Sequence, residues 1–134
     1  IAFRFLSHTD MPAEDIATIV SAIGNHDEGT GVPVNAVAAA LILADKSDVR
    51  RSRVRNQDIS KFDIHDRVNF SVIGSELTIS EDKASIVLSL QIDTEFGSIM
   101  DYFEIFLVRM AMCKRAAEAL NMKFKLVING DRMG

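Results

Sequence analysis

Residues 77–92, LTISEDKASIVLSLQI, decide the fold class of this chain because apolar residues there recur at every second position, although Val87 breaks the strict alternation. Leu77 and Ile79 precede the polar turn SEDK, and the alternation resumes after it. The apolar residues after the turn are Ile86, Leu88, Leu90 and Ile92. A period of two on both sides of a short polar turn predicts a β-hairpin.

The segment that follows changes to a helical period. Ser98 and Asp101 form a capping-box pattern, which predicts the start of a helix that runs to about Leu120. Its apolar stripe is Ile99, Phe103, Phe106, Leu107, Met110, Cys113, Ala117 and Leu120, with Glu104 and Arg109 expected on the outer face. Residues 123–129 alternate again and predict a closing strand. We therefore expect one long helix to cover a small three-stranded sheet.

The first part of the chain is helical. Asp10 and Pro12 predict the start of a first helix, and the turn GNHDEGTG at residues 24–31 ends it. A second helix is expected from Asn35 to about Arg50, and Asp63 is expected to cap a short third one. The predicted fold class is α+β, with a partial helical bundle over residues 1–60 and an α+β module over residues 61–134.

Composition excludes several classes of protein. Apolar residues make up 48% and charged residues 25% of the 134 residues, which is typical of a globular domain. The formal net charge of −4 argues against a general nucleic-acid binder. A lone cysteine, Cys113, excludes an intrachain disulfide framework and suits a reducing cytoplasm, and the chain has no apolar stretch of membrane-spanning length. We expect a cytoplasmic protein without a membrane or nucleic-acid partner.

Two residues at the ends of apolar stripes are candidates for chemistry. Asp45 follows Leu41 and Ile42 on the second helix, and a carboxylate on an apolar face needs a cation, a proton or a hydrogen-bond network. Lys46 points about 100° away on a helix and is not the expected partner. His26 continues the stripe of the first helix across the glycine turn. Nitrogen and oxygen donors of this kind suit Mn, Fe, Co, Ni or Mg. The alternatives are an Asp45 paired with an arginine and a His26 that caps or fills the core.

A run of basic residues follows Asp45. Lys46, Arg50 and Arg53 have the spacing of one helix face, if the helix continues that far. Cations so placed beside a metal would bind the oxygens of a phosphate group. The alternatives are a solvated helix end, where cations complement the helix dipole, and an RNA contact, which the lack of aromatic residues nearby disfavours.

The stretches IATIVSAIGNHDEGTG and AAALILADKSDVRRSRVR, within residues 13–55, resemble the second half of an HD-domain metal-dependent phosphohydrolase. The resemblance implies that Asp45, in LILADKSD, is the terminal metal ligand and that His26 is an accessory ligand. The first His and the His-Asp dyad of that family have no counterpart before residue 13. Because the chain opens at Ile1 without Met, we expect it to begin inside the HD domain.

The resemblance implies a fragment of a metal-dependent phosphohydrolase that acts on a phosphate ester such as a nucleotide. We expect the divalent metal to be incompletely coordinated in this chain alone, and the chain alone to be inactive. A homodimer is also expected, with the C-terminal module as the packing element. The alternative function is a non-catalytic regulatory or dimerisation module.

Overall fold

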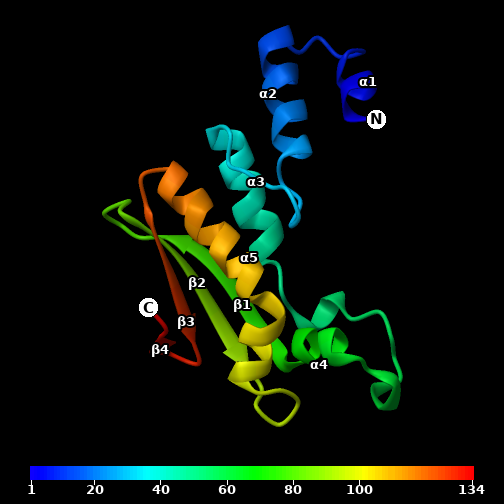
Figure 1. Ribbon diagram of the computed structural model, residues 1–134, viewed down its shortest axis with the longest axis vertical. Coiled ribbons are helices and arrows are strands. Elements are labelled where there is room, and N and C mark those ends of the chain that lie inside the picture. Colours follow the sequence, from blue (N-terminus) through cyan, green and yellow to red (C-terminus); the bar gives the residue numbers. More distant parts are fainter.

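The hairpin expected at residues 77–92 is present and forms the centre of the protein. In this computed structural model, which describes residues 1–134, β1 (Val72–Ile79) pairs antiparallel with β2 (Ser85–Ile92). The long helix α5 (Ile99–Ala119) then crosses over to β3 (Lys123–Ile128), which pairs parallel with β2. The parallel pairing follows because a strand–helix–strand connection returns the chain to the same end of the sheet. Figure 1 shows this arrangement, with α5 lying across the sheet.

The sheet has four strands, so the expected count of three is wrong by one. Strand β4 (Asp131–Arg132) turns back on β3 and gives the strand order β1-β2-β3-β4. Asn129 and Gly130 make the turn with positive φ values of 51° and 88°. An Asn-Gly pair favours this two-residue hairpin turn because both residues tolerate positive φ, so the signal was already in the sequence. The fold class is α+β, as predicted.

Four further helices precede or flank the sheet. They are α1 (Ala2–Leu6), α2 (Ala13–Gly24), α3 (Ala36–Ser47) and α4 (Ile64–Ser71), with two 3₁₀ turns, η1 (Arg51–Arg53) and η2 (Ile59–Lys61), between α3 and α4. Asn35 caps α3 and Asp63 caps α4, each by accepting a hydrogen bond from a backbone N–H. Ser98 and Asp101 form the predicted capping box of α5. No helix combines the length and the apolarity that crossing a bilayer requires.

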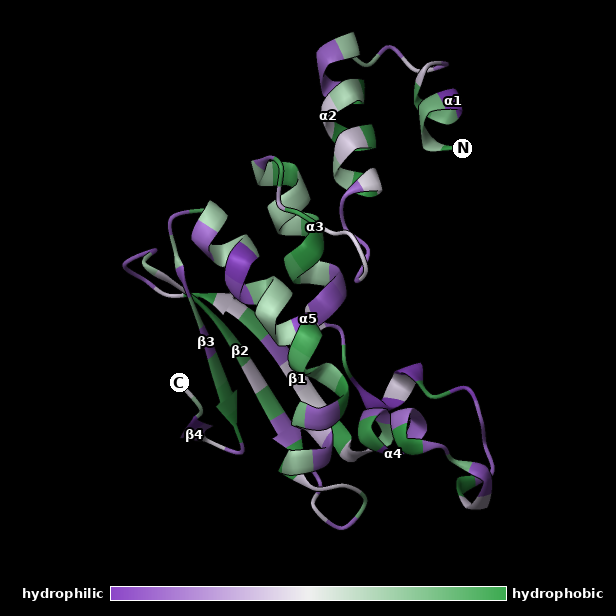
Figure 2. Cartoon of the chain, in the orientation of Figure 1, coloured by the Kyte–Doolittle hydropathy of each residue, from purple (hydrophilic) through white to green (hydrophobic).

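The core lies between the sheet and α5 and continues into α3. From β2 it receives Leu88 and Leu90, from α5 it receives Phe106 and Cys113, and from α3 it receives Ile42, all in one cluster of buried residues. Figure 2 shows α3 apolar over most of its length and polar at its C-terminal end. Helices α3 and α5 thus share one core, although they lie on opposite sides of the predicted boundary at residue 60. The division into segments 1–60 and 61–134 stays a prediction.

Helices α1 and α2 extend away from the sheet, and α2 contacts the rest of the protein through α3 (Figure 1). Of the apolar stripe of α2, Ile16 is buried whereas Ile23 is exposed. On α1, which was not predicted, Phe3 and Phe5 are also exposed. The protein therefore leaves apolar side chains of its first two helices in contact with solvent.

Candidate functional site

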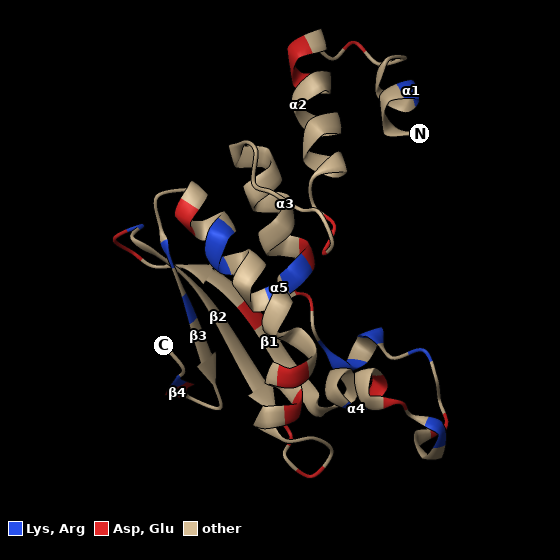
Figure 3. Cartoon of the chain, in the orientation of Figure 1, with Lys and Arg blue, Asp and Glu red and all other residues tan.

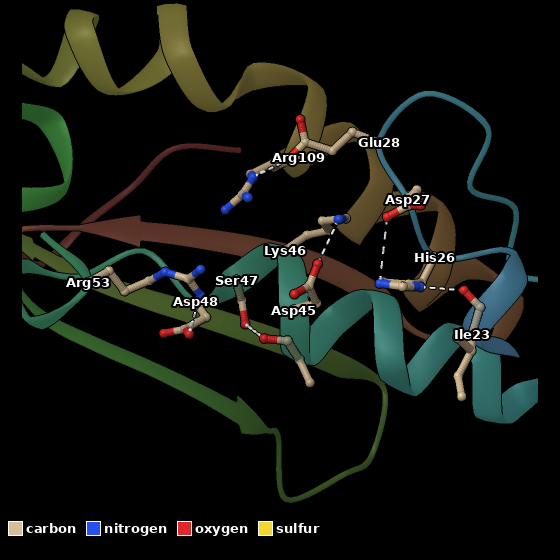
Figure 4. Close-up of polar contacts among 11 residues, drawn as sticks. Ile23, His26, Asp27, Glu28, Asp45, Lys46, Ser47, Asp48, Arg53 and Arg109 are labelled. Atoms are coloured by element: carbon tan, nitrogen blue, oxygen red, sulfur yellow. Dashed lines mark hydrogen bonds and ion pairs between the residues drawn. The ribbon is translucent and has the colours of Figure 1, made fainter. Parts of the chain in front are cut away.

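The residues singled out around position 45 lie where three elements meet. The loop between α2 and α3 contributes His26, Asp27 and Glu28, and the end of α3 contributes Asp45 and Lys46. Helix α5 contributes Arg109. Figure 4 shows these side chains in one region, where the polar contacts join them in separate pairs: His26 with Asp27, Asp45 with Lys46, and Glu28 with Arg109. Charged residues that are far apart in the sequence are thus drawn together where these three elements meet.

His26 lies in the loop, because α2 ends at Gly24 and does not carry its helical stripe to residue 26 as expected. The ring is nevertheless oriented by the preceding turn, since Nδ1 lies 2.5 Å from the carbonyl oxygen of Ile23. A carbonyl oxygen only accepts, so Nδ1 carries the proton and donates it. In the neutral ring, Nε2 is left with its lone pair, and it lies 3.7 Å from Asp27 Oδ1. A backbone acceptor on one ring nitrogen is the usual support of a histidine that uses its other nitrogen as a ligand.

Asp45 is paired with its neighbour in the sequence. Lys46 Nζ lies 2.6 Å from Asp45 Oδ2, so the expectation that Lys46 is not the partner is wrong. The reason is that α3 turns Lys46, not Asp45, toward the core: the Lys46 side chain is 5% exposed and that of Asp45 39%. The long lysine stem allows its ammonium group to bend back to the edge of the helix. Asp45 Oδ1 makes no hydrogen bond within the chain.

The charges of the site keep Asp45 ionised. Burial opposes ionisation, but the hydrogen bond from Lys46 and the charges of Lys46, His26 and Arg109 outweigh it and lower the pKa of Asp45 below its ordinary value. His26 and Asp45 make no hydrogen bond or ion pair with each other, so the sequence-based pairing of the two as metal ligands stays a prediction. An ionised carboxylate is an oxygen donor for a divalent cation, and the His26 ring adds a nitrogen donor only in its neutral form, in which it no longer contributes a positive charge.

Arg109 belongs to the site, although it was expected on the outer face of the long helix. Its side chain is 22% exposed and forms an ion pair with Glu28 in the loop. The signal was present in the sequence, because Arg109 comes three residues after Phe106 and four before Cys113, which are both buried. Arg109 therefore ties the loop that carries His26 to α5.

A metal centre is not complete within residues 1–134. Nowhere do three or more His, Cys, Asp or Glu side chains come together in a way that could hold a metal ion. Of the donors present, His26 Nε2 and Asp45 Oδ1 fit a metal in type and have no stronger partner within the chain. These residues would supply two ligands and not a full coordination sphere.

The expected phosphate-binding trio does not share one face. Helix α3 ends at Ser47, where the chain turns to bury Val49, so Arg50 and Arg53 do not continue the helix. Both arginines bind Asp48, with Arg50 Nε 2.8 Å from Oδ1 and Arg53 Nη1 2.7 Å from Oδ2. Lys46 is buried and pairs with Asp45. The three cations therefore do not form one face, and each of them is already paired with a carboxylate.

Comparison with known proteins does not add to this description. No protein-family model, curated protein or solved structure matches the chain significantly. The geometry and charge of the site are therefore the evidence for its function.

Proposed function

We propose that this chain is part of a metal-dependent phosphohydrolase of the HD-domain type, in which Asp45 and His26 bind a divalent metal ion. The observation that supports the proposal is that His26 Nε2 and Asp45 Oδ1, drawn in the same region of Figure 4, each lack a hydrogen bond within the chain, because the Nδ1 contact with Ile23 and the Lys46 contact use the other atom of each group. The sequence LILADKSD around Asp45 supports the same assignment by its resemblance to that family.

Each residue of the site has a role in this proposal. Asp45 Oδ1 is the anionic ligand, and Lys46 holds the other carboxylate oxygen so that the group stays ionised and oriented. His26 Nε2 is the second, accessory ligand. When bound, the metal polarises a phosphoryl oxygen and lowers the pKa of a bound water. Arg109 positions the loop through Glu28.

A complete metal site needs ligands besides these two. The family's apolar run that ends in His-Asp has no counterpart among these residues. We therefore propose that the isolated chain binds a metal weakly and hydrolyses no phosphate ester. The substrate class is a phosphate ester, with the nucleotide as one member. The proposed location is the cytoplasm, consistent with the single buried thiol.

The test measures metal binding and hydrolysis separately. On this chain, Mn²⁺ should broaden the NMR signals of the His26 ring, and Asp45→Asn, which still accepts the Lys46 hydrogen bond, should abolish that broadening. In the full-length protein, Asp45→Asn should remove bound metal and p-nitrophenyl phosphate hydrolysis together. Glu118→Gln, at an exposed carboxylate of α5 with no ion pair, is the matched control. Metal and activity retained in Asp45→Asn would contradict the proposal.

A non-catalytic module is the second candidate, and one observation favours it. The Lys46 ammonium already neutralises Asp45, so the carboxylate is satisfied without a metal. In that case the charged site would only join α3, α5 and the loop, and the C-terminal half would mediate self-association. The full-length protein would then contain no metal and hydrolyse no phosphomonoester.

A further inference from the structure

Strand β1 is an outer strand of the sheet, and no strand pairs with its far edge. The Leu90 carbonyl of β2 accepts a hydrogen bond from the N–H of Asn129, so even-numbered residues of β2 face β3 and odd-numbered ones face β1. Those odd-numbered residues lie opposite even-numbered residues of β1. The N–H and C=O groups of Ser75, Leu77 and Ile79 therefore point to the free edge.

This edge lies away from both termini. Gly134 follows β4 at the opposite edge of the sheet, and α1 extends away from the sheet (Figure 1). Strand β1 itself contains no Lys, Arg or Pro, the residues that commonly protect an outer strand. A bulge between Val72 and Gly74 leaves Ser75–Ile79 as the regular part of the edge. An unprotected edge of this kind is a template for another strand.

The regular part of the edge carries apolar side chains on the face of the sheet that packs on α5. Leu77 and Ile79 lie opposite Leu88 and Ile86, which are buried, yet they are themselves 37% and 61% exposed. Beside Ser75, a hollow of about 420 Å³ separates β1 from the end of α3. Its lining residues are Ala44, Ser47, Asp48, Arg50, Ser75 and Leu77. An exposed apolar side chain and a hollow thus lie four residues apart on one edge.

The two ends of β1 carry opposite charges. The turn after β1 contains Glu81 and Asp82 against Lys83, and Glu81 forms no ion pair. Near the start of β1, a hollow of about 450 Å³ is lined by Arg50 and Arg51 and by no Asp or Glu. The Arg50 side chain is 58% exposed despite its ion pair. Figure 3 shows this basic segment and the hairpin turn at opposite ends of the sheet, so an antiparallel copy of β1 would bring acid onto base.

We propose that this edge binds a second copy of the chain, in a twofold-symmetric dimer whose two β1 strands pair antiparallel about Leu77. The proposal does not depend on the metal site. Leu77 pairs with its own counterpart, and Ser75 pairs with Ile79 of the other copy. Directly opposite residues share a face of the sheet, so each Ile79 side chain enters the hollow beside the other copy's Ser75. Each Glu81 then lies near the other copy's Arg50.

The register about Leu77 follows from the pattern of β1. Leu77 is the middle residue of Ser75–Ile79, so this register pairs the whole regular edge with itself. It sets Glu76 opposite Thr78 on the other face of the sheet. A register about Glu76 would set two carboxylates directly opposite each other, which is destabilising.

Sedimentation equilibrium of the full chain measures the dimer. We expect a reversible dimer at about 100 μM that dissociates on dilution. Leu77→Lys places two ammonium groups at the twofold axis and should raise the dissociation constant at least about tenfold. In hydrogen exchange, the Leu77 amide of the wild type should exchange more slowly in the dimer than in the dilute chain.

A charge exchange between the copies tests the register. Glu81→Arg and Arg50→Glu, each alone, set like charges together at both ends of the interface and should each weaken the dimer about tenfold. An equal mixture of the two variants forms heterodimers in which both contacts are again of opposite charge. The mixture should therefore regain affinity to within about threefold of the wild type, which a loss of folding in either variant would prevent. Glu14→Arg, the same charge change on α2, is the control and should leave the dimer unchanged.

The proposal is overturned if the chain is monomeric at about 1 mM, where specific complexes are formed. A dimer that Leu77→Lys does not weaken would use another face, such as the exposed apolar residues of α1, and would also overturn it. A dimer whose affinity the mixture of charge variants does not regain would exclude this register. An unprotected Leu77 amide in the dimer would exclude the pairing of the β1 strands.

Discussion

Lys46 Nζ lies 2.6 Å from Asp45 Oδ2, and of the two side chains the cation is the more deeply buried, at 5% exposure against 39% for the carboxylate. The arrangement reverses the expectation that the acid lies on the apolar face of α3. The buried ammonium group of Lys46 is thus the counter-ion of the proposed metal ligand Asp45.

Removal of the two partners should therefore have unequal effects. Asp45→Ala leaves a buried ammonium group without a partner, and we expect it to lower the free energy of unfolding by about 2 kcal/mol, less than for a fully buried pair because water reaches the site. Lys46→Met fills the same space without a charge and should change the free energy by less than about 1 kcal/mol. Urea unfolding of both variants measures the difference. In the double variant, Lys46→Met should restore most of the loss; additive effects would show that the pair is not coupled.

Arg51 should be the most important side chain in the loop between α3 and α4. Its guanidinium carbon lies 4.1 Å from the ring centroid of Phe70, and its Nε donates to the carbonyl of Phe70 at 2.6 Å. An ion pair with Asp93 at 3.6 Å also joins it to the loop before α5. We expect Arg51→Ala to lower the free energy of unfolding by about 2 kcal/mol.

Arg51→Lys should not restore that loss, because an ammonium group cannot stack on the ring and donate from the same plane. Arg55→Ala, at an exposed cation of the same loop, is the control and should change stability by less than about 0.5 kcal/mol. Thermal unfolding of the three variants tests the assignment. Equal stability of Arg51→Lys and the wild type would contradict it.

Cys113 should be unreactive in the folded protein. Burial raises the pKa of its thiol to about 12, with smaller effects from nearby charges, so the reactive thiolate is scarce at neutral pH. We expect the native chain to react with Ellman's reagent at pH 8 at least about 100-fold more slowly than the chain in urea. Rapid labelling of the native chain would show that α5 is not packed on the sheet and α3 as described.

The capping box of α5 should make stability depend on pH. Hydrogen bonds from the backbone N–H and the hydroxyl of Ser98 lower the pKa of Asp101 from its ordinary value of 3.8. A carboxyl group with a lowered pKa in the folded state stabilises above its unfolded pKa and loses that effect as the pH falls through the folded value. The wild type should therefore exceed Asp101→Asn in stability at pH 6, and the difference should disappear well below pH 3.8. Urea unfolding across this range measures it.

Much of the fold could be predicted because its signals are local. The alternation in β1 and β2, the capping box at Ser98 and the cap at Asp63 each depend on residues within a few positions of one another, and all are present. The end of α3 could not be predicted in this way. Residues 48–53 have helical character, but burial of Val49 and the stacking of Arg51 on Phe70 turn the chain away.

For the site, the sequence determined which donors exist, namely an imidazole in a glycine-rich turn and a carboxylate near the end of the helix that follows. Only the tertiary structure decided that Lys46 neutralises Asp45 and that Arg109 enters from α5. It also decided that Arg50 and Arg53 bind Asp48 instead of forming one cationic face. The physical reason is that ion pairs depend on distances of a few ångströms between groups on separate elements. Helical spacing sets only the direction of a side chain, and the packing of α3 on α5 sets what it meets.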